Sequence, residues 1–382
     1  MQVAIFHPLL EVGGGAEKLA LEMHKALLEL GYESRLLTFV ADEERLNKVI
    51  ELLTPGFKPH LDIHKLPLAS RLLDAFTAGF TRGRLVRLRR ALLTRFLLEK
   101  VERRSNELLI DTASHIPTPV DIAYVHIPLV LSETRDGAVW GLYNWLVKKV
   151  ASSLTGDAKL VLVNSTWTKK IFESVYGSRY RVEILYPPVD VEYFYSDNKA
   201  REKAIVTISR FSPEKRLESI LTVARELPEY QFYILGSATR ASKKVLENLV
   251  KRIEEKGLKN VEVKTNVPRE ELRNLLSKAM FYLHPPYPEH FGLSVAEAIA
   301  AGAIPIVYRD GGAWTDIVSK IDINLGYTDI REVPKLIKTM EKGPEILNML
   351  RMRGQSLVLS FNYNGFKQKI VNILEIFKHK DA

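Results

Sequence analysis

Two glutamates lie eight positions apart in the stretch EHFGLSVAEAIAAG, residues 289–302, and their spacing suggests chemistry. Glu289 follows the proline-rich run HPPYP, so we expect it in a strand-to-helix loop, where a carboxylate can accept hydrogen bonds from sugar hydroxyls. Backbone N–H groups at the start of the next helix can bind phosphate. Glu297 also has a structural explanation, because Ser294 and Glu297 have the spacing of a capping box. The sequence offers no structural explanation for Glu289. The carboxylates and the N–H groups of this turn together fit a nucleotide sugar.

A second stretch, TISRFSPEKRLESI at residues 207–220, supplies two cations. Arg210 ends an expected strand, and Lys215 begins an expected helix, so both lie where α/β folds bind ligands. Arginine can bind phosphate through two hydrogen bonds and lysine adds a second charge, so the pair can neutralise a diphosphate without a metal ion. The sequence contains no Asp-x-Asp, the usual carboxylate handle for a metal-bound sugar nucleotide. The alternative is an exposed arginine and a lysine on a helix face.

A glycine-rich loop near the N-terminus, HPLLEVGGGAE at residues 7–17, joins an expected strand to an expected helix. Glycines let a backbone approach a ligand closely, and the helix start presents N–H groups to an anion. The loop is not the GxGxxG dinucleotide fingerprint, and a tight turn explains it equally well.

Strand-like and helix-like segments alternate along both halves of the chain, which predicts an α/β fold with parallel sheets. The expected strands are 3–6, 35–40, 121–126, 159–164, 204–209, 231–235, 261–264, 280–284 and 304–308. The expected helices include 16–30, 166–176, 214–226, 242–256, 269–279 and 363–377. The prolines of YPPVDVEYF mark a domain boundary. We therefore expect two Rossmann-like domains, residues 1–190 and 191–360, facing each other across a cleft, and a C-terminal helical segment, 361–382, packing back toward the first.

The composition limits the class of protein. With 382 residues, 46% of them hydrophobic, the chain can bury two cores. It has no cysteine, which excludes disulfides and indicates a reducing compartment. The N-terminal residues lack the features of a signal peptide, and no apolar run approaches the roughly 18 residues of a membrane-spanning helix. We expect a cytoplasmic protein.

The net charge of +9 is concentrated in residues 69–104, which hold ten basic residues against three acidic ones. Their apolar residues have helical spacing, so this segment suits an anionic membrane surface. The alternative is an ordinary helix with a solvated arginine face. A nucleic-acid partner is not expected, because aromatic residues do not interleave the arginines as a base-stacking platform would need.

The run EHFGLSVAEAIAAGAIPIV resembles the signature of family 4 retaining glycosyltransferases of GT-B fold, which carry an E-x7-E pattern like that of Glu289 and Glu297. Further segments of this chain resemble other parts of the family, in the same order along the sequence. They are GGGAEKLALEMHKALLELGYE, DIAYVHIP, VNSTWTKKIFESVYG, YPPVDVEYF and SRFSPEK. Residues 42–109 resemble the family least. The GGGAE and EHFGL forms look most like mannosyltransferases that extend lipid-linked oligosaccharides with GDP-mannose.

This resemblance implies roles for matching positions. Arg210 and Lys215 would hold the donor diphosphate, Glu289 would contact the donor sugar near its anomeric centre, and Glu297 would bind the ribose. His126 would lie near the donor sugar or the acceptor, although a lone histidine at a strand end is more often structural. The remaining donor-binding positions are Phe291, Gly292, Leu293 and Ser294 around the phosphates, and Gly14 and Gly15, which would close on the diphosphate or the acceptor.

The implied activity is metal-independent, retaining transfer of mannose from GDP-mannose to a lipid-linked saccharide or other glycan, with no cofactor beyond the donor. Retention permits either a carboxylate nucleophile or a front-face route in which Glu289 only positions the sugar. Two alternatives remain open, a nucleotide-sugar epimerase of similar architecture and a non-catalytic nucleotide-sugar-binding protein. A membrane-linked acceptor would place the enzyme at the cytoplasmic face of the membrane.

Overall fold

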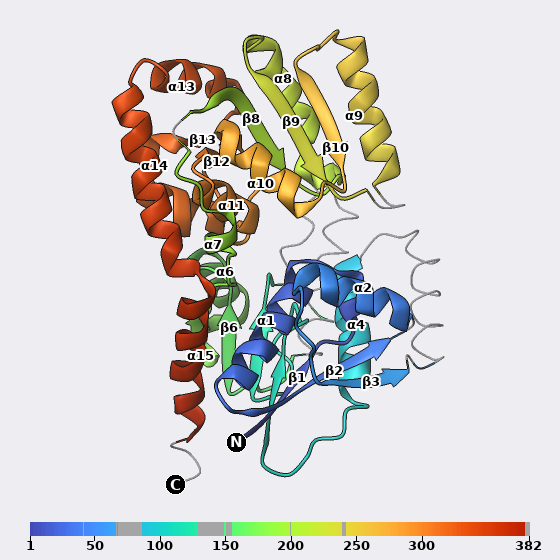
Figure 1. Cartoon of the computed structure of the whole chain (residues 1–382). Helices are drawn as coiled ribbons and strands as arrows, with labels where there is room; N and C mark the ends of the chain where they lie inside the picture. Colours follow the sequence, from blue (N-terminus) through green and yellow to red (C-terminus); the bar gives the residue numbers. More distant parts are fainter. Residues whose placement is uncertain are drawn as a thin grey trace. The chain divides into compact units, whose positions relative to one another are not determined.

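The computed structural model describes residues 1–40, 42–65, 67, 86–128, 149, 155–198, 200–238 and 242–378. The chain divides into two compact units (Figure 1). The N-terminal unit comprises Met1–Tyr186 and Phe366–Ala382, and the C-terminal unit comprises Pro187–Gly365. In the described part of the chain, no helix is both long and apolar enough to cross a bilayer.

Parallel strands form the sheet of the N-terminal unit, in the order β3-β2-β1-β4-β5-β6-β7. They are β1 Gln2–Phe6, β2 Glu33–Val40, β3 Leu61–Lys65, β4 Glu107–Asp111, β5 Ile122–Val125, β6 Leu160–Val163 and β7 Val182–Ile184. Strands β5 and β6 are buried along their whole length, as parallel strands covered on both faces are. The strand order reverses between β1 and β4, and α/β sheets bind ligands at the carboxyl edge of such a reversal.

Five described helices belong mainly to this unit: α1 Gly15–Glu29, α2 Glu43–Leu53, α4 Val86–Leu98, α6 Thr166–Tyr176 and α15 Tyr363–Lys378. Ser165 caps α6 by accepting a hydrogen bond from the Thr168 N–H, which confirms the predicted start of this helix. Lys367 of α15 pairs with Glu29 of α1 at 2.9 Å, so the C-terminal helix is tied to α1.

Helix α4 holds most of the described part of the predicted membrane-contact segment, residues 86–104, because residues 69–85 lie outside the described residues. Leu93 and Leu97 of α4 are buried in the core of the unit, beside Phe39 and Phe172. This part of its apolar face therefore packs inside the protein, as the alternative of an ordinary amphipathic helix requires.

The sheet of the C-terminal unit is also parallel, with the order β10-β9-β8-β11-β12-β13. Its strands are β8 Glu202–Ile208, β9 Gln231–Gly236, β10 Val261–Thr265, β11 Ala279–Leu283, β12 Ile304–Tyr308 and β13 Gly326–Tyr327. Its helices are α7 Val191–Phe194, α8 Ile220–Glu226, α9 Lys243–Glu255, α10 Arg269–Lys278, α11 Leu293–Ala300, the π-helix η6 Ala313–Val318, α12 Ser319–Ile321, α13 Val333–Met340 and α14 Pro344–Val358. The strand order reverses between β8 and β11, which makes these two strands neighbours.

The predicted helix over residues 214–226 is wrong in its first half. The 3₁₀ turn η4, Pro213–Lys215, is followed by Arg216 in the left-handed conformation, with φ of 47°. A second 3₁₀ turn, Leu217–Ser219, leads into α8. The left-handed residue interrupts the helix and buries both Lys215 and Leu217.

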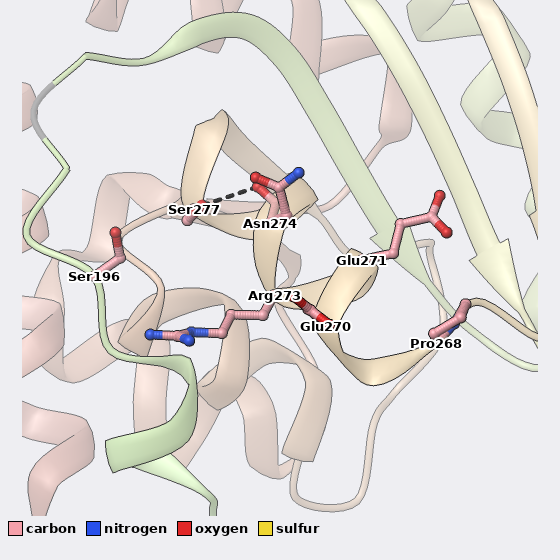
Figure 2. A pocket seen from close by; sticks show the side chains of 7 residues that line it. All are labelled: Ser196, Pro268, Glu270, Glu271, Arg273, Asn274 and Ser277. Carbon is pink, nitrogen blue, oxygen red and sulfur yellow. Dashed lines mark hydrogen bonds between the residues drawn. The ribbon is translucent and has the colours of Figure 1, made fainter.

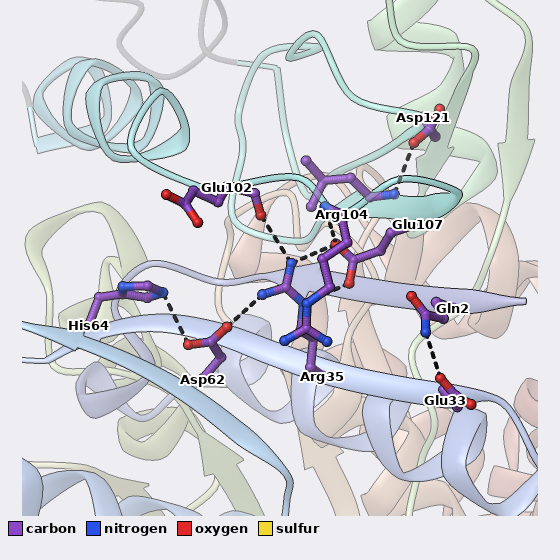
Figure 3. A network of polar contacts seen from close by, with 10 residues as sticks. Gln2, Glu33, Arg35, Asp62, His64, Glu102, Arg104, Glu107 and Asp121 are labelled. Carbon is purple, nitrogen blue, oxygen red and sulfur yellow. Dashed lines mark hydrogen bonds and ion pairs between the residues drawn. The ribbon is translucent and has the colours of Figure 1, made fainter.

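Arg35 of β2 organises the amino end of the N-terminal sheet (Figure 3). Its guanidinium donates two hydrogen bonds of 2.6 Å to the Glu107 carboxylate of β4 and one of 2.6 Å to Asp62 of β3. The side chains of Arg35 and Glu107 are only 8% and 3% exposed. Burial raises the pKa of Glu107, but the hydrogen bonds from Arg35 oppose it and the net pKa lies below the ordinary value. One buried cation thus joins three strands.

We expect Arg35→Met to lower the free energy of unfolding by about 3 kcal/mol, because it leaves Glu107 charged and unpaired in the interior. Urea denaturation followed by circular dichroism measures this loss. Arg45→Met is the matched control: Arg45 is exposed on α2, and its replacement should change stability by less than about 0.5 kcal/mol. Equal stability of the two variants would contradict the structural role of Arg35.

Candidate active site

Glu289 lies in the loop after β11 and forms an ion pair with Lys215, which follows β8. The Lys215 Nζ is 2.6 Å from Glu289 Oε2, and the His284 Nε2 lies 3.4 Å from the same oxygen. The Lys215 side chain is 6% exposed and that of Glu289 is 26% exposed. The residues meet because β8 and β11 are neighbours at the strand reversal. The expectation that Glu289 has no structural role is therefore wrong.

The carboxylate of Glu289 is held in its ionised form. Burial pushes the pKa of Glu289 upward, but the Lys215 ammonium and the hydrogen bond from His284 outweigh it, and the net pKa lies well below the ordinary value. Glu289 is therefore a weak base at neutral pH. It can accept hydrogen bonds, and it is poorly suited to carry a proton.

Lys215 is also confined by an aromatic ring, because its Nζ lies 4.0 Å from the centroid of Tyr287. Arg210 differs, since its side chain is exposed and makes no ion pair with any described residue. The pair therefore combines one buried cation, balanced by a carboxylate, with one cation that is available to an anionic ligand at the same sheet edge.

Two glycines lock the Glu289 loop against the loop that follows β12. Glu289 and Gly311 form an isolated parallel bridge, and a Cβ at Gly311 would lie 2.4 Å from the Glu289 carbonyl oxygen. Gly292 has φ of 101°, and a Cβ there would lie 2.8 Å from that of Ala313. Only glycine permits this close approach. Both residues also have positive φ, which is a second reason for glycine at these positions.

The predicted capping box is wrong, because α11 begins at Leu293 with Gly292 at its N-cap. Ser294 is inside the helix, where its Oγ lies 2.9 Å from the Tyr282 hydroxyl. Glu297 is half-buried one turn further along. Gly292 has no side chain, so the N-cap residue accepts no hydrogen bond from the first N–H groups of α11. Phe291 is buried, and its ring lies 5.3 Å from that of Phe361 in an edge-to-face contact.

Sequence reasoning missed three residues of this site: His284, Tyr287 and Gly311. The first two belong to the HPPYP run, whose prolines predict only a turn, although its histidine and tyrosine flank a proline pair. Gly311 belongs to a glycine pair that follows the buried strand β12. A glycine pair at the carboxyl end of a parallel strand is the signal that identifies it.

The N-terminal unit places its predicted residues at the carboxyl edge of its own sheet. The His126 Nε2–H donates to the Thr112 carbonyl at 2.8 Å, and burial lowers the pKa of His126 to about 4. His126 is therefore neutral at physiological pH, and only its Nδ1 can accept a hydrogen bond.

Gly14 is the N-cap of α1 and Gly15 is its first residue. Glu17 folds back over them, since its Oε2 lies 3.0 Å from where a Cβ of Gly14 would be. Its Oε1 lies 3.6 Å from the His7 Nε2, and both side chains are buried. The anionic side chain of Glu17 thus already lies beside the start of this helix.

A groove of about 590 Å³ lies along α10 of the C-terminal unit (Figure 2). Its lining residues are Ser196, Pro268, Glu270, Glu271, Arg273, Asn274 and Ser277. None of the predicted site residues lines it, and its two glutamates make it unsuited to a diphosphate. Separately, the described residues contain no group of His, Asp and Glu side chains placed to hold a metal ion.

Comparison with known proteins agrees with this architecture. Residues 13–193 match the family described as Glycosyltransferase Family 4, and residues 192–352 match the family described as Glycosyl transferases group 1. Among solved structures, that of Anabaena HepE in complex with UDP and glucose aligns with a TM-score of 0.71 at 16% identity, covering 98% of this chain and 99% of that one. Sucrose-phosphate synthase from Thermosynechococcus elongatus aligns with a TM-score of 0.72 at 15% identity, covering 100% of both chains.

Several curated relatives share the name GDP-Man:Man(3)GlcNAc(2)-PP-Dol alpha-1,2-mannosyltransferase. The Dictyostelium discoideum protein is 24% identical, over 98% of this chain and 84% of its own length. The Homo sapiens protein is 30% identical, but the match covers 46% of this chain and only 39% of that protein.

The two parallel sheets define the GT-B fold. The chain belongs to the glycosyltransferases that combine a Family 4 domain with a group 1 domain, and it is an enzyme of that class.

We expect Gly311→Ala to lower activity by about 100-fold or more, because the new Cβ must displace the backbone that carries Glu289. Gly257→Ala is the matched control, since Gly257 also has positive φ but nothing lies within 4 Å of its Cβ position. Both variants carry the strain of a left-handed alanine, and only the first should lose turnover. Donor consumption and thermal unfolding, measured side by side, separate the two effects.

Acid should remove the contribution of Glu289 to stability. Because its folded pKa is depressed, that contribution is complete above the unfolded value of 4.5 and is lost as the pH falls through the folded pKa. The gap in unfolding free energy between the native chain and Glu289→Gln should therefore shrink between neutral pH and about pH 3. A gap that stays constant with pH would show that the charge of Glu289 does not stabilise the fold through its ion pair with Lys215.

Proposed function

We propose that this enzyme is a retaining, metal-independent mannosyltransferase that moves mannose from GDP-mannose to a lipid-linked saccharide. The observation that carries the proposal is the arrangement of Arg210, Lys215 and Glu289, which places two cations and an ionised carboxylate at one sheet edge. The names of the curated relatives support the choice of donor and acceptor. The donor nucleotide sugar is the only small molecule that the reaction requires.

In this mechanism, Arg210 and Lys215 bind the diphosphate and offset the charge that develops on it as the leaving group departs. The N–H groups at the start of α11, from Leu293 and Ser294, add hydrogen bonds to the phosphate. These groups supply the electrostatic stabilisation that a divalent cation provides in other nucleotide-sugar enzymes. Glu297 binds the ribose hydroxyls.

The acceptor hydroxyl attacks the anomeric carbon on the face from which the phosphate leaves. The new bond joins the acceptor oxygen to that carbon, the bond from the anomeric carbon to the phosphate oxygen breaks, and the proton of the hydroxyl moves to the departing phosphate. The products are GDP and the mannoside of unchanged anomeric configuration. Glu289 positions the sugar by accepting a hydrogen bond, because its lowered pKa and its Lys215 partner make it a poor base and a poor nucleophile.

The glycine loop of the N-terminal unit is assigned to the acceptor rather than to the diphosphate. Glu17 lies against Gly14, and its negative charge would repel a phosphate at this helix start. A neutral, hydroxylated saccharide meets no such repulsion. His126 fits the same assignment, since its bare Nδ1 can accept a hydrogen bond from a sugar hydroxyl.

Product analysis tests the proposal directly. The enzyme is incubated with GDP-mannose, UDP-glucose or UDP-GlcNAc, in EDTA, with and without a lipid-linked saccharide. The expected result is acceptor-dependent release of GDP and an α-linked product. A changed sugar without acceptor would indicate an epimerase, and donor binding without turnover would indicate a binding protein. Loss of all activity in EDTA would contradict a metal-independent reaction.

Two substitutions should separate binding from transfer. We expect Glu289→Gln to lower transfer by about 100-fold and GDP affinity far less, because the amide removes the negative charge that positions the sugar and balances Lys215, whereas Arg210 and the N–H groups of α11 still bind the diphosphate. Arg210→Ala should weaken GDP binding by about tenfold or more and lower transfer with it. Calorimetry with GDP and a transfer assay give both quantities. The control is Arg225→Ala, which replaces an exposed arginine on α8. Native turnover by Glu289→Gln would remove the role proposed for Glu289.

A lipid-linked acceptor implies contact with a membrane, and we assign this contact to the basic residues of 69–104. Their net positive charge favours an anionic cytoplasmic leaflet. Co-sedimentation with phosphatidylserine vesicles at low salt checks this, and the absence of binding would exclude it.

A further inference from the structure

The two contacts of the Glu289 carboxylate converge on a single oxygen. Lys215 and His284 both approach Oε2, at 2.6 Å and 3.4 Å, whereas Oε1 has no hydrogen-bond partner among the described residues. One oxygen is thus an anchor, and the other is available to a ligand. A carboxylate held in this way keeps a fixed orientation only as long as its anchor remains.

His284 is held in place by its backbone and by its burial. Its backbone N–H donates to the Ile306 carbonyl at 2.9 Å, and its own carbonyl accepts a hydrogen bond of 2.6 Å from the Tyr327 hydroxyl. Its side chain is 3% exposed, and two prolines follow it. The ring therefore has little freedom to move. Since a carboxylate can only accept, the His284 Nε2 must carry the proton in this contact.

Lys215 has a second task under the proposed function, besides balancing Glu289. When its ammonium also binds the donor diphosphate, the charge is shared and its hold on Glu289 weakens. We propose that His284 is a positioning residue, which holds Oε2 of Glu289 while Lys215 serves the donor, so that Oε1 stays directed at the sugar. This inference rests on the proposed function and deepens it.

The proposal differs from a purely structural role for His284. If His284 only filled the core, a ring of similar size would replace it. If it positions Glu289, the requirement is an N–H donor at the place of Nε2. Glutamine can put an amide N–H there, whereas phenylalanine keeps the ring and has no donor, and asparagine places its amide at the position of Nδ1.

The test compares His284→Phe, His284→Gln and His284→Asn in the full chain, with GDP-mannose as donor. We expect His284→Phe and His284→Asn to lower kcat about tenfold or more while GDP affinity stays within about twofold, because misplacing Glu289 affects the transition state more than nucleotide binding. His284→Gln should restore most of kcat. Equal activities of the glutamine and phenylalanine variants, or a parallel loss of GDP binding and kcat, would overturn the proposal. His64→Phe, a substitution of a histidine in β3, is the control.

Nuclear magnetic resonance gives a readout that does not depend on turnover. The chain has nine histidines, so ¹⁵N-histidine labelling gives few signals, and the His284 signal is the one missing in His284→Gln. It should show the Nε2–H tautomer, shift in Glu289→Gln, and keep its tautomer when GDP is added. If GDP does not bind at all, the proposed function fails while the Glu289→Gln comparison still tests the contact. An unchanged His284 signal in Glu289→Gln would exclude the contact itself.

Discussion

The ammonium of Lys215 is buried, and the need to balance it shapes the carboxyl edge of the C-terminal sheet. A buried charge without a partner costs several kcal/mol, so Lys215 requires a carboxylate within reach. Glu289 supplies it from a loop 74 positions further along the chain. The two meet only because the strand order reverses between β8 and β11. The same ion pair that stabilises these loops therefore also holds an ionised carboxylate at the sheet edge where β8 leads into the exposed Arg210.

The backbone around this ion pair adopts conformations that few residues tolerate. Arg216 is left-handed directly after Lys215, and Gly292 and Gly311 have positive φ on either side of the Glu289 loop. Residues in such conformations persist where the surroundings over-determine them, and they cluster at functional sites. Here they have a definite effect. The turn at Arg216 directs Lys215 inward, and the glycines allow the Glu289 backbone to bridge the loop after β12.

Local sequence patterns were sufficient for the parts of the structure that local physics decides. The strand over 304–308 is found as predicted, and Ser165 caps its helix, because apolar runs and caps depend on neighbouring residues. Contacts between distant segments were not accessible in this way. The capping box at Ser294 was wrong because the bridge between Glu289 and Gly311 and the conformation of Gly292 place the helix start earlier. The pairing of Glu289 with Lys215 is not predictable from the sequence for the same reason, although the sequence places both residues where strands lead into helices.

The two units differ in the charge that they offer to a ligand, and this difference supports a division of labour. The carboxyl edge of the C-terminal sheet has the exposed Arg210 and the uncapped start of α11, both suited to an anion. The corresponding edge of the N-terminal sheet has a neutral His126 and a buried Glu17 beside its glycine loop. Since a diphosphate requires positive charge and a saccharide requires hydrogen-bonding groups, these charges are consistent with the proposed function, in which the C-terminal unit binds the donor nucleotide and the N-terminal unit binds the acceptor. Under the proposed function, the position of Glu17 beside Gly14 favours a saccharide over a diphosphate at this glycine loop.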